Sequence, residues 1–252
     1  MTGPTEVHNG KVCLDDVEQV LPLKSWWAML LVLPVVKRLT LLTVNHTRIS
    51  PNLITLASIV LRLGAAALFL EASHPALACA ALVFYLAYVL DCMDGAVARL
   101  RRQSSELGRY LDHMGDLMGG IIMVAALAYG QGLLWSPFAI GLIFCHIAEG
   151  YISYLCSTLF APRKHETLVP PSGAWARSPL NLYLQGRSYF HQRNIKSFIS
   201  FPDYEATIFI VFPLLNMAAL GLKFGFYMAI SVALYTVFST FVSLHSGEHR
   251  FP

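Results

Sequence analysis

Charged residues are scarce in this chain of 252 residues, where Asp, Glu, Lys and Arg together make up 13%. Soluble domains usually carry about 25% of such residues, so this low share argues against a water-soluble globule. Hydrophobic residues reach 56%, and they form long blocks, as in membrane helices. The chain also lacks an excess of basic charge, since its net charge is only +3. A nucleic-acid binder would need a concentrated basic face, so we expect no nucleic-acid partner.

The sequence also predicts neither a disulfide framework nor a cleavable signal peptide. The five cysteines are odd in number and lack the spacing of a metal site, so we interpret them as small buried hydrophobic residues. Residues 1–22 form a mixed polar N-terminus that includes acidic residues, which is not the pattern of a signal peptide. Entry into the membrane is therefore expected to depend on the body of the chain.

The apolar blocks predict an all-α integral membrane protein with a single membrane domain over residues 1–252. Residues 23–45 contain Trp26 and Trp27 as interfacial anchors and are interrupted by Pro34. This block predicts an amphipathic helix at the interface, with a true span as the alternative. Six later blocks approach the ~20 residues that cross a hydrocarbon layer of ~30 Å. These six predicted transmembrane helices, which form a bundle over residues 51–244, are 51–71, 76–98, 110–130, 137–160, 204–222 and 225–244.

Basic residues are unevenly shared between the two sides of this predicted bundle. Four arginines lie between the second and third spans, and six Lys and Arg residues lie in the polar loop 162–203. The loops on the opposite side carry only Lys223. Because cytoplasmic loops carry an excess of Lys and Arg, we expect both termini and the loop 162–203 to face the cytoplasm.

Four aspartates lie near the cytoplasmic ends of the second and third predicted spans. Asp91 and Asp94 are three residues apart and Asp112 and Asp116 are four apart, so each pair shares one helix face. Acids inside a span are costly unless they are partnered, and they indicate a functional site. Four carboxylates need cations to stay ionised together. Oxygen ligands suit Mg²⁺ or Mn²⁺, and four can hold two ions. The carboxylates alone leave open a proton or cation pathway of a secondary transporter.

The residues around the aspartates form a longer pattern, DCMDGAVARLRRQSSELGRYLDHMGD from Asp91 onward. Its skeleton is Asp, two residues, Asp-Gly, two residues, Ala-Arg, eight residues, Gly, three residues, Asp, three residues and Asp. This skeleton resembles the signature of the CDP-alcohol phosphotransferase family at all of its eight fixed positions, and the six predicted spans fit the fold of that family. The resemblance implies an enzyme that moves a substituted phosphate from a CDP-linked donor to an alcohol and releases CMP.

The resemblance also implies roles for individual residues. Asp91, Asp94 and Asp112 resemble the metal ligands, and Asp116 resembles the last acid, which contacts a metal and serves as general base for the acceptor hydroxyl. Small residues leave the backbone open to a nucleotide, and an arginine supplies a fork for phosphate oxygens. The implied cradle for cytidine diphosphate is Gly95, Ala98, Arg99 and Gly108, together with Asn52 and Thr55 at the start of the first span, for which helix initiation is the alternative.

Other polar residues are weaker candidates for substrate contacts. Glu149, inside the fourth span, resembles a Glu and Tyr stretch of the choline and ethanolamine phosphotransferases, and His113 resembles the second residue of their Asp-His pair. His146 shares a helix face with Glu149, with a purely structural role as the alternative. An anionic acceptor or lipid headgroups would find four basic residues in the loop 162–203, where positive-inside bias alone is the alternative. These loop residues are Arg187, His191, Arg193 and Lys196.

Three further charged residues have two interpretations each. Arg62 lies midway along the first span, where we expect it to pair with a membrane acid such as Glu149 or to bind a substrate phosphate. Asp203 and Glu205 lie where the fifth span begins. They are expected either to line the same cytoplasmic cavity or to cap the helix.

The sequence leaves the donor and the acceptor open within phospholipid or polar-lipid synthesis. Either CDP-diacylglycerol reacts with a small acceptor such as glycerol phosphate, inositol phosphate, inositol or serine, or a CDP-linked small alcohol reacts with a lipid. The expected partners are thus a CDP-linked donor, an alcohol acceptor and membrane lipid. Dimerisation is common in such families, which allows a homodimer, although the sequence has no clear interface motif. A transporter explains the intramembrane acids but not the Gly, Ala and Arg at fixed offsets, and inverted repeats are not found.

Overall fold

The computed structural model describes residues 12–21, 25–159, 183, 186, 189–190 and 199–245, and every regular element in these ranges is a helix. Six segments of the described residues are long and apolar enough to cross a membrane, which confirms the predicted all-α membrane architecture. In chain order the elements are α1 (Leu14–Val20), the π-helical η2 (Ala28–Val32), α2 (Leu33–His46), α3 (Pro51–Glu71), α4 (His74–Leu100), α5 (Glu106–Gly130), α6 (Pro137–Leu159), α8 (Phe201–Ala206), the π-helical η4 (Thr207–Val211), α9 (Phe212–Leu214) and α10 (Ala218–His245).

The set of six segments differs from the predicted set at two places. Ala28–His46 qualifies as a span by length and composition, whereas the sequence predicts an interfacial helix there. The predicted span 204–222 does not qualify, because α8, η4 and α9 are short and the chain turns before α10 begins. The predicted break between the spans 204–222 and 225–244 is wrong, because α10 continues through it. A side chain at Gly221 would meet Phe212, and one at Gly225 would meet Ile208, so these glycines allow close packing inside α10 and do not form a loop.

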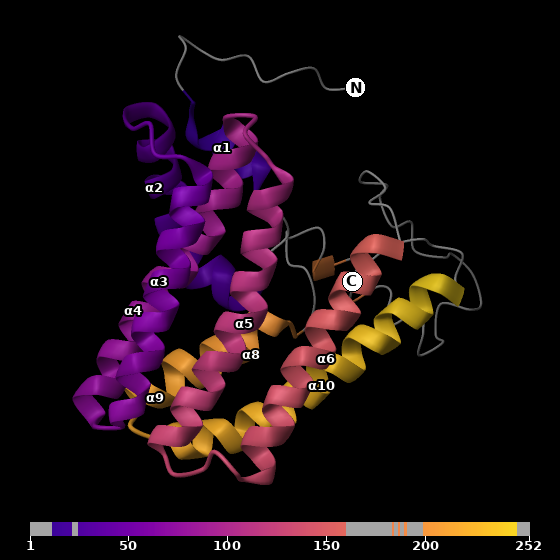
Figure 1. Ribbon diagram of the computed structural model, residues 1–252. Helices are drawn as coiled ribbons and strands as arrows, with labels where there is room; N and C mark the ends of the chain where they lie inside the picture. Colours follow the sequence, from indigo (N-terminus) through magenta and orange to yellow (C-terminus); the bar gives the residue numbers. More distant parts are fainter. Residues whose placement is uncertain are drawn as a thin grey trace.

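Serine caps fix the starts of the three helices that carry most of the predicted site. Ser50, Ser73 and Ser105 each accept a hydrogen bond on the side-chain oxygen from a backbone N–H three residues later, which satisfies one free donor of the first turn. Between α4 and α5 the chain reverses through Arg102, whose φ of 55° is left-handed. Because this connection is short, the end of α4 and the start of α5 lie at the same end of the bundle (Figure 1).

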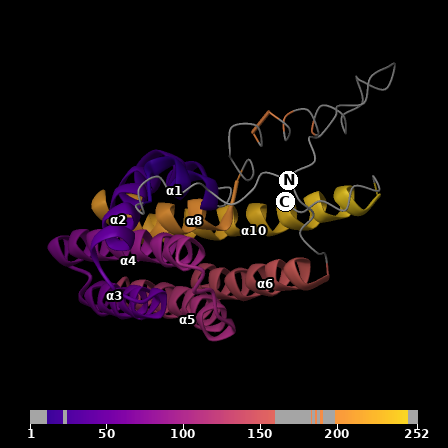
Figure 2. The same ribbon diagram turned by 90° about the horizontal axis from the view of Figure 1, so that it is seen from above.

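The long helices pack in two groups. Helix α3 lies against α4 and α5, while α6 pairs with α10 and also contacts α5 (Figure 1). The helices α1 and α2 lie on the α4 side of the bundle (Figure 2). Aromatic rings fill the core between α3, α4 and η4, where the ring centroid of Phe209 lies 5.1 Å from that of Phe84 and 6.0 Å from that of Phe69.

An arginine at the end of α4 ties the N-terminal helices to the bundle. The guanidinium of Arg101 donates to three backbone carbonyls at and just beyond the C-terminal turn of α2, at 2.5–2.8 Å, from Thr43, Thr47 and Ile49. Carbonyls in the last turn of a helix lack partners within the helix, and a cation there also interacts favourably with the helix dipole. Arg101 therefore fixes α2 against the end of α4 that carries the aspartates.

We expect Arg101→Gln to lower the free energy of unfolding by about 1–3 kcal/mol, because the shorter amide cannot reach three carbonyls and each net hydrogen bond contributes about 1 kcal/mol. Thermal unfolding of the purified protein in detergent measures this loss. The exposed Arg48 provides the control, and Arg48→Gln is expected to change stability by less than about 0.5 kcal/mol. Equal stability of the two variants would contradict the role of Arg101.

Candidate active site

The two aspartate pairs meet where α4 ends and α5 begins. Carboxylate oxygens of Asp91, Asp112 and Asp116 all lie within 4.8 Å of one another, and all three residues are half-buried. Asp94 is buried and is not part of this group, and its carboxylate accepts a hydrogen bond from the Thr55 hydroxyl on α3. The structure thus brings three of the four predicted metal ligands into one group. Oxygen ligands at this separation, from two helices, are the donor set that Mg²⁺ and Mn²⁺ prefer.

Arg62 of α3 joins the aspartates of both helices. Its Nη2 lies 3.0 Å from Oδ1 of Asp91, and its Nη1 lies 2.6 Å from Oδ1 of Asp116. The side chain is only 4% exposed, as expected for a paired charge in a membrane span. The expected pairing with a membrane acid is therefore confirmed, but the partners are Asp91 and Asp116 and not Glu149, which lies on α6 and accepts a hydrogen bond from Ser153 at 3.1 Å.

A first cavity of about 270 Å³ lies on the α3–α4–α5 side of the aspartates. Asp94 and Asp112 line it, together with serines and Gln103 from the connection between α4 and α5. The six residues predicted for nucleotide binding all line this same cavity: Asn52, Thr55, Gly95, Ala98, Arg99 and Gly108. The fold therefore brings residues from α3, α4 and α5 together around one cavity.

Two glycines of the first cavity leave room for polar side chains. The guanidinium of Arg99 lies over Gly95, where an added Cβ would be 3.2 Å from Nη1. Arg99 is also anchored, because its Nε donates at 2.8 Å to the carbonyl of Val20 at the end of α1. At Gly108 an added Cβ would lie 2.9 Å from the Asn52 Oδ1. Larger residues at these glycines would therefore fill the cavity or displace its polar groups.

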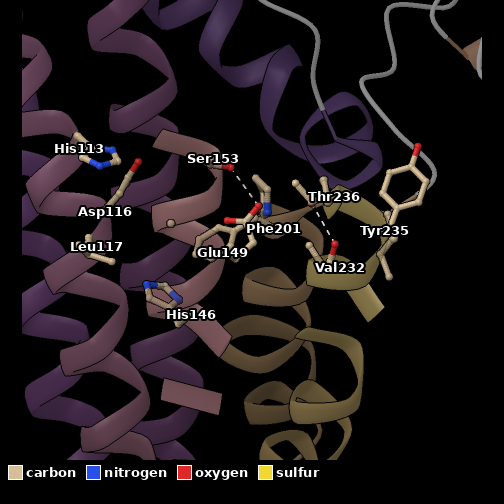
Figure 3. Close-up of a pocket in the computed structure, with 14 residues that line it drawn as sticks. His113, Asp116, Leu117, His146, Glu149, Ser153, Phe201, Val232, Tyr235 and Thr236 are labelled. Atoms are coloured by element: carbon tan, nitrogen blue, oxygen red, sulfur yellow. Dashed lines mark hydrogen bonds between the residues drawn. The ribbon is translucent and has the colours of Figure 1, made fainter. Parts of the chain in front are cut away.

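A second cavity, of about 200 Å³, begins at Asp116 and extends between α5, α6, α8 and α10. Its lining includes His113, His146 and Glu149, the three substrate candidates that lie within the spans. In Figure 3 the side chains of His113 and Asp116 lie at one side of this cavity and that of Tyr235 at the other, with Glu149 between them. The aspartate group is therefore bordered by the first cavity through Asp112 and by the second cavity through Asp116.

His146 of the second cavity is held by close contacts with its neighbours. Its Nδ1 is hydrogen-bonded to the hydroxyl of Tyr204, and its ring centroid lies 4.7 Å from that of Phe201. The residue is 1% exposed, and Gly120 lies so close to the ring that any Cβ there would collide with it. These contacts give His146 a structural place at the wall of the cavity.

Further predicted residues are the four basic candidates of the loop 162–203 and Asp203. The loop candidates Arg187, His191, Arg193 and Lys196 lie outside the described residues. Asp203 caps α8, since its Oδ2 accepts hydrogen bonds from the Ser200 backbone N–H at 3.0 Å and from the Ser200 hydroxyl at 2.6 Å. The capping alternative therefore holds for this residue.

Sequence reasoning missed the part of the second cavity that α8 and α10 provide. Phe201, Tyr235 and Thr236 line it, but they belong to no motif and lie far from the aspartates in the chain. Ser153 also lines this cavity. The sequence does indicate its position, because Ser153 follows Glu149 by four residues and so shares the same helix face.

Among known protein families, the sequence model of the CDP-alcohol phosphatidyltransferases matches residues 48–242 of this chain. The chain belongs to the CDP-alcohol phosphatidyltransferase family. It is therefore a phosphotransferase of phospholipid biosynthesis and a multi-pass integral membrane protein. The matched range includes the four aspartates, both cavities and every described helix from α3 to α9, with most of α10.

Among solved structures, this member of the family resembles the phosphatidylinositol phosphate synthase of Mycobacterium tuberculosis, whose crystal structure has CDP-DAG bound. The two chains are 16% identical, the match covers 84% of this chain and 94% of the synthase, and the TM-score is 0.48. Comparison with curated protein sequences gave no match.

We expect Thr55→Val to lower the free energy of unfolding of this transferase by about 1–3 kcal/mol, because the buried Asp94 carboxylate loses a donor while the side-chain volume is kept. Chemical unfolding in detergent without divalent cations measures the effect. Thr55→Ser keeps the hydroxyl and is expected to retain most of the stability. A valine variant as stable as the wild type would show that the bond between Thr55 and Asp94 is unimportant.

Proposed function

We propose that this transferase moves the substituted phosphate of a CDP-linked donor to an acceptor hydroxyl in a reaction that needs divalent cations and releases CMP. The observation that carries the proposal is that two cavities border one group of carboxylates. A donor in the first cavity and an acceptor in the second would bring their reacting atoms to the aspartates from two sides. Such positioning supplies a large part of catalysis in phosphoryl transfer.

The first cavity fits the cytidine diphosphate part of the donor. Gly95, Ala98 and Gly108 have no long side chain, so a nucleotide can approach the backbone of α4 and α5. Arg99 offers its terminal nitrogens to phosphate oxygens, since its Nε is already held by Val20. The diphosphate would then lie toward Asp94 and Asp112, on the side of the aspartate group.

The residues present fit a divalent cation. Asp91, Asp112 and Asp116 would hold Mg²⁺ or Mn²⁺, with Asp94 as a further ligand from the side of the first cavity. Four carboxylates lead us to propose two ions. When bound, such ions offset the negative charge of the diphosphate and polarise the phosphorus under attack.

The proposed chemistry assigns proton transfer to Asp116, which lines the second cavity and is 45% exposed. Its carboxylate takes the proton of the acceptor hydroxyl as the hydroxyl oxygen forms a bond to the phosphorus distal to the cytidine. The bond from this phosphorus to the oxygen of CMP breaks, and CMP leaves with the electron pair. Arg62 contributes by pairing with one oxygen of Asp91 and one oxygen of Asp116, which holds these two carboxylates in place.

The charges of the second cavity favour one class of substrate. Its described lining has the carboxylates of Asp116 and Glu149 and contains no lysine or arginine. These carboxylates favour a neutral hydroxyl or a cationic amino group over a further negative charge in this part of the cavity. We propose that this cavity takes an uncharged or cationic alcohol group. We further propose that the aspartates face the cytoplasm, because the arginine-rich connection between α4 and α5 lies at their end of the bundle.

CMP release by the purified enzyme tests the reaction. CDP-diacylglycerol, CDP-choline, CDP-ethanolamine and CDP-inositol, each with matching acceptors, are incubated in liposomes with Mg²⁺, with Mn²⁺ or with a chelator. We expect metal-dependent release that falls by about 10²–10⁴-fold in Asp116→Asn, because the general base is lost. Asp15→Asn, on the exposed face of α1, serves as the control. Release that persists with the chelator, or unchanged release in Asp116→Asn, would refute the proposed roles.

The nucleotide cradle has a separate test that needs no turnover. We expect Gly108→Val to weaken CMP binding at least about tenfold, since its side chain enters the first cavity beside Asn52 and one lost contact of about 1.4 kcal/mol corresponds to a factor of ten. Titration calorimetry with CMP and Mg²⁺ measures the affinity. Gly64→Val is the matched control, because no atom lies within 4 Å of an added Cβ at that position. Equal affinities in the two variants would place the nucleotide elsewhere.

A further inference from the structure

Arg62 makes contacts that a helix-packing role does not require. It lies twelve residues into α3, a helix whose other charged residue is the terminal Glu71. Its two terminal nitrogens contact carboxylates on two different helices, Asp91 of α4 and Asp116 of α5, and Nη1 also donates at 3.4 Å to the carbonyl of Gly115. One guanidinium thus bridges two members of the carboxylate group, and these two members are 25 residues apart in the chain.

Arg62 contacts only one oxygen of each carboxylate, which leaves the other oxygen available to bind a cation or an acceptor hydroxyl. The guanidinium of Arg62 contacts Oδ1 of Asp91 and Oδ1 of Asp116, and neither contact involves Oδ2. A guanidinium is planar and holds carboxylates in a fixed fork geometry, which an ammonium does not. Arg62 can therefore set the orientation of both carboxylates while one oxygen of each stays free for a cation or an acceptor hydroxyl.

A small residue on α5 makes the position of the guanidinium possible. An added Cβ at Gly119 would lie 3.2 Å from Cδ of Arg62 and 3.6 Å from Nη1. The arginine side chain therefore runs along the bare backbone of α5 before it reaches Asp116. Because the side chains of Arg62 and Asp91 are 4% and 18% exposed, water screens this contact weakly, whereas the contact with the 45% exposed Asp116 is screened more.

We propose that Arg62 is a built-in counter-ion of the aspartate group, which holds Asp91 and Asp116 together when divalent cations are absent. Its positive charge also weakens the binding of divalent cations, because it offsets part of the negative charge that attracts them. This inference rests on the proposed function, in which the group holds Mg²⁺ or Mn²⁺. Both the guanidinium and the divalent ion are attracted by the same carboxylates, so each is held more weakly when the other is present. By thermodynamic linkage the effect is reciprocal. Arg62 also acts as a positioning residue for Asp116, since it fixes one of that residue's two oxygens.

Mn²⁺ binding to the purified protein without substrates tests the inference, with free Mn²⁺ followed by electron paramagnetic resonance. Arg62→Gln removes the charge, and we expect the dissociation constant for Mn²⁺ to fall by about tenfold, within the usual range of coupling between two sites. Arg62→Lys keeps the charge but loses the fork, and its Mn²⁺ affinity is expected to stay within about threefold of wild type. In both variants kcat for CMP release is expected to fall more than tenfold, because Asp116 is no longer oriented.

Matched variants separate this charge effect from a loss of stability. Arg101→Gln also removes a guanidinium with several partners, but these are backbone carbonyls, so Mn²⁺ affinity is expected to be unchanged. If Arg62→Gln yields no folded protein, Gly119→Ala carries the test, since its methyl group would stand 3.2 Å from Cδ of Arg62 and push this side chain by a few tenths of an ångström without changing any charge. Tighter Mn²⁺ binding than wild type is then expected, and unchanged or weaker binding overturns the inference.

The outcomes distinguish this inference from the proposed function. Mn²⁺ binding by the wild type that is unchanged or weakened in Arg62→Gln refutes the counter-ion and leaves the metal-dependent reaction intact. A wild-type protein that binds no Mn²⁺ refutes both. Tighter binding in Arg62→Gln together with a lower kcat supports both the antagonism and the positioning of Asp116.

Discussion

Mutual repulsion among carboxylates is the constraint on which the arrangement of this membrane protein depends. Asp91, Asp112 and Asp116 bring oxygens within 4.8 Å of one another, and such a group is stable only beside positive charge or hydrogen-bond donors. Helix α3 supplies both. Thr55 donates to Asp94, and Arg62, seven residues later and so on the same helix face, joins Asp91 to Asp116. This polar face of α3 packs beside buried apolar residues of the same helix, among them Ala65 and Phe69.

The same group of carboxylates also divides the space around it. The first cavity lies among the ends of α3, α4 and α5, and the second lies between α5, α6, α8 and α10. In the proposed reaction, separate cavities that border common carboxylates would keep the two substrates apart until their reacting atoms meet. Burial of the surrounding residues would then strengthen electrostatic effects on the transferring phosphate.

Small residues make this architecture possible at several depths. Gly119 admits the side chain of Arg62 and Gly120 admits the ring of His146, while Gly225 of α10 lies against Ile208 of η4. Glycine in a helix costs about 1 kcal/mol relative to alanine, and here that cost is offset by close approach of helices or of a polar side chain. The N-terminal helices also contribute, because Val20 at the end of α1 holds Arg99 at the first cavity.

Local patterns in the sequence were sufficient for five of the six candidate spans and for the two aspartate pairs. The pairs of aspartates are set by helical periodicity, and a short connection with a serine cap brings α4 and α5 together, so Asp91 and Asp116 could be placed near each other without a structure. The partner of Arg62 could not be assigned in this way, because intramembrane acids on α4, α5 and α6 were all within reach of a residue in the middle of α3.

Only the tertiary structure decided the features that depend on contacts between distant segments. Gly221 and Gly225 look like a loop in the sequence, but they pack against Phe212 and Ile208 inside a continuous helix. The wall of the second cavity combines α6 with Phe201 and Tyr235, which no periodicity links to the aspartates. The sequence by itself therefore determined which chemical groups each helix carries, because period and capping are local properties. Which groups face one another depends on side-chain packing between helices, and that was decided by the fold.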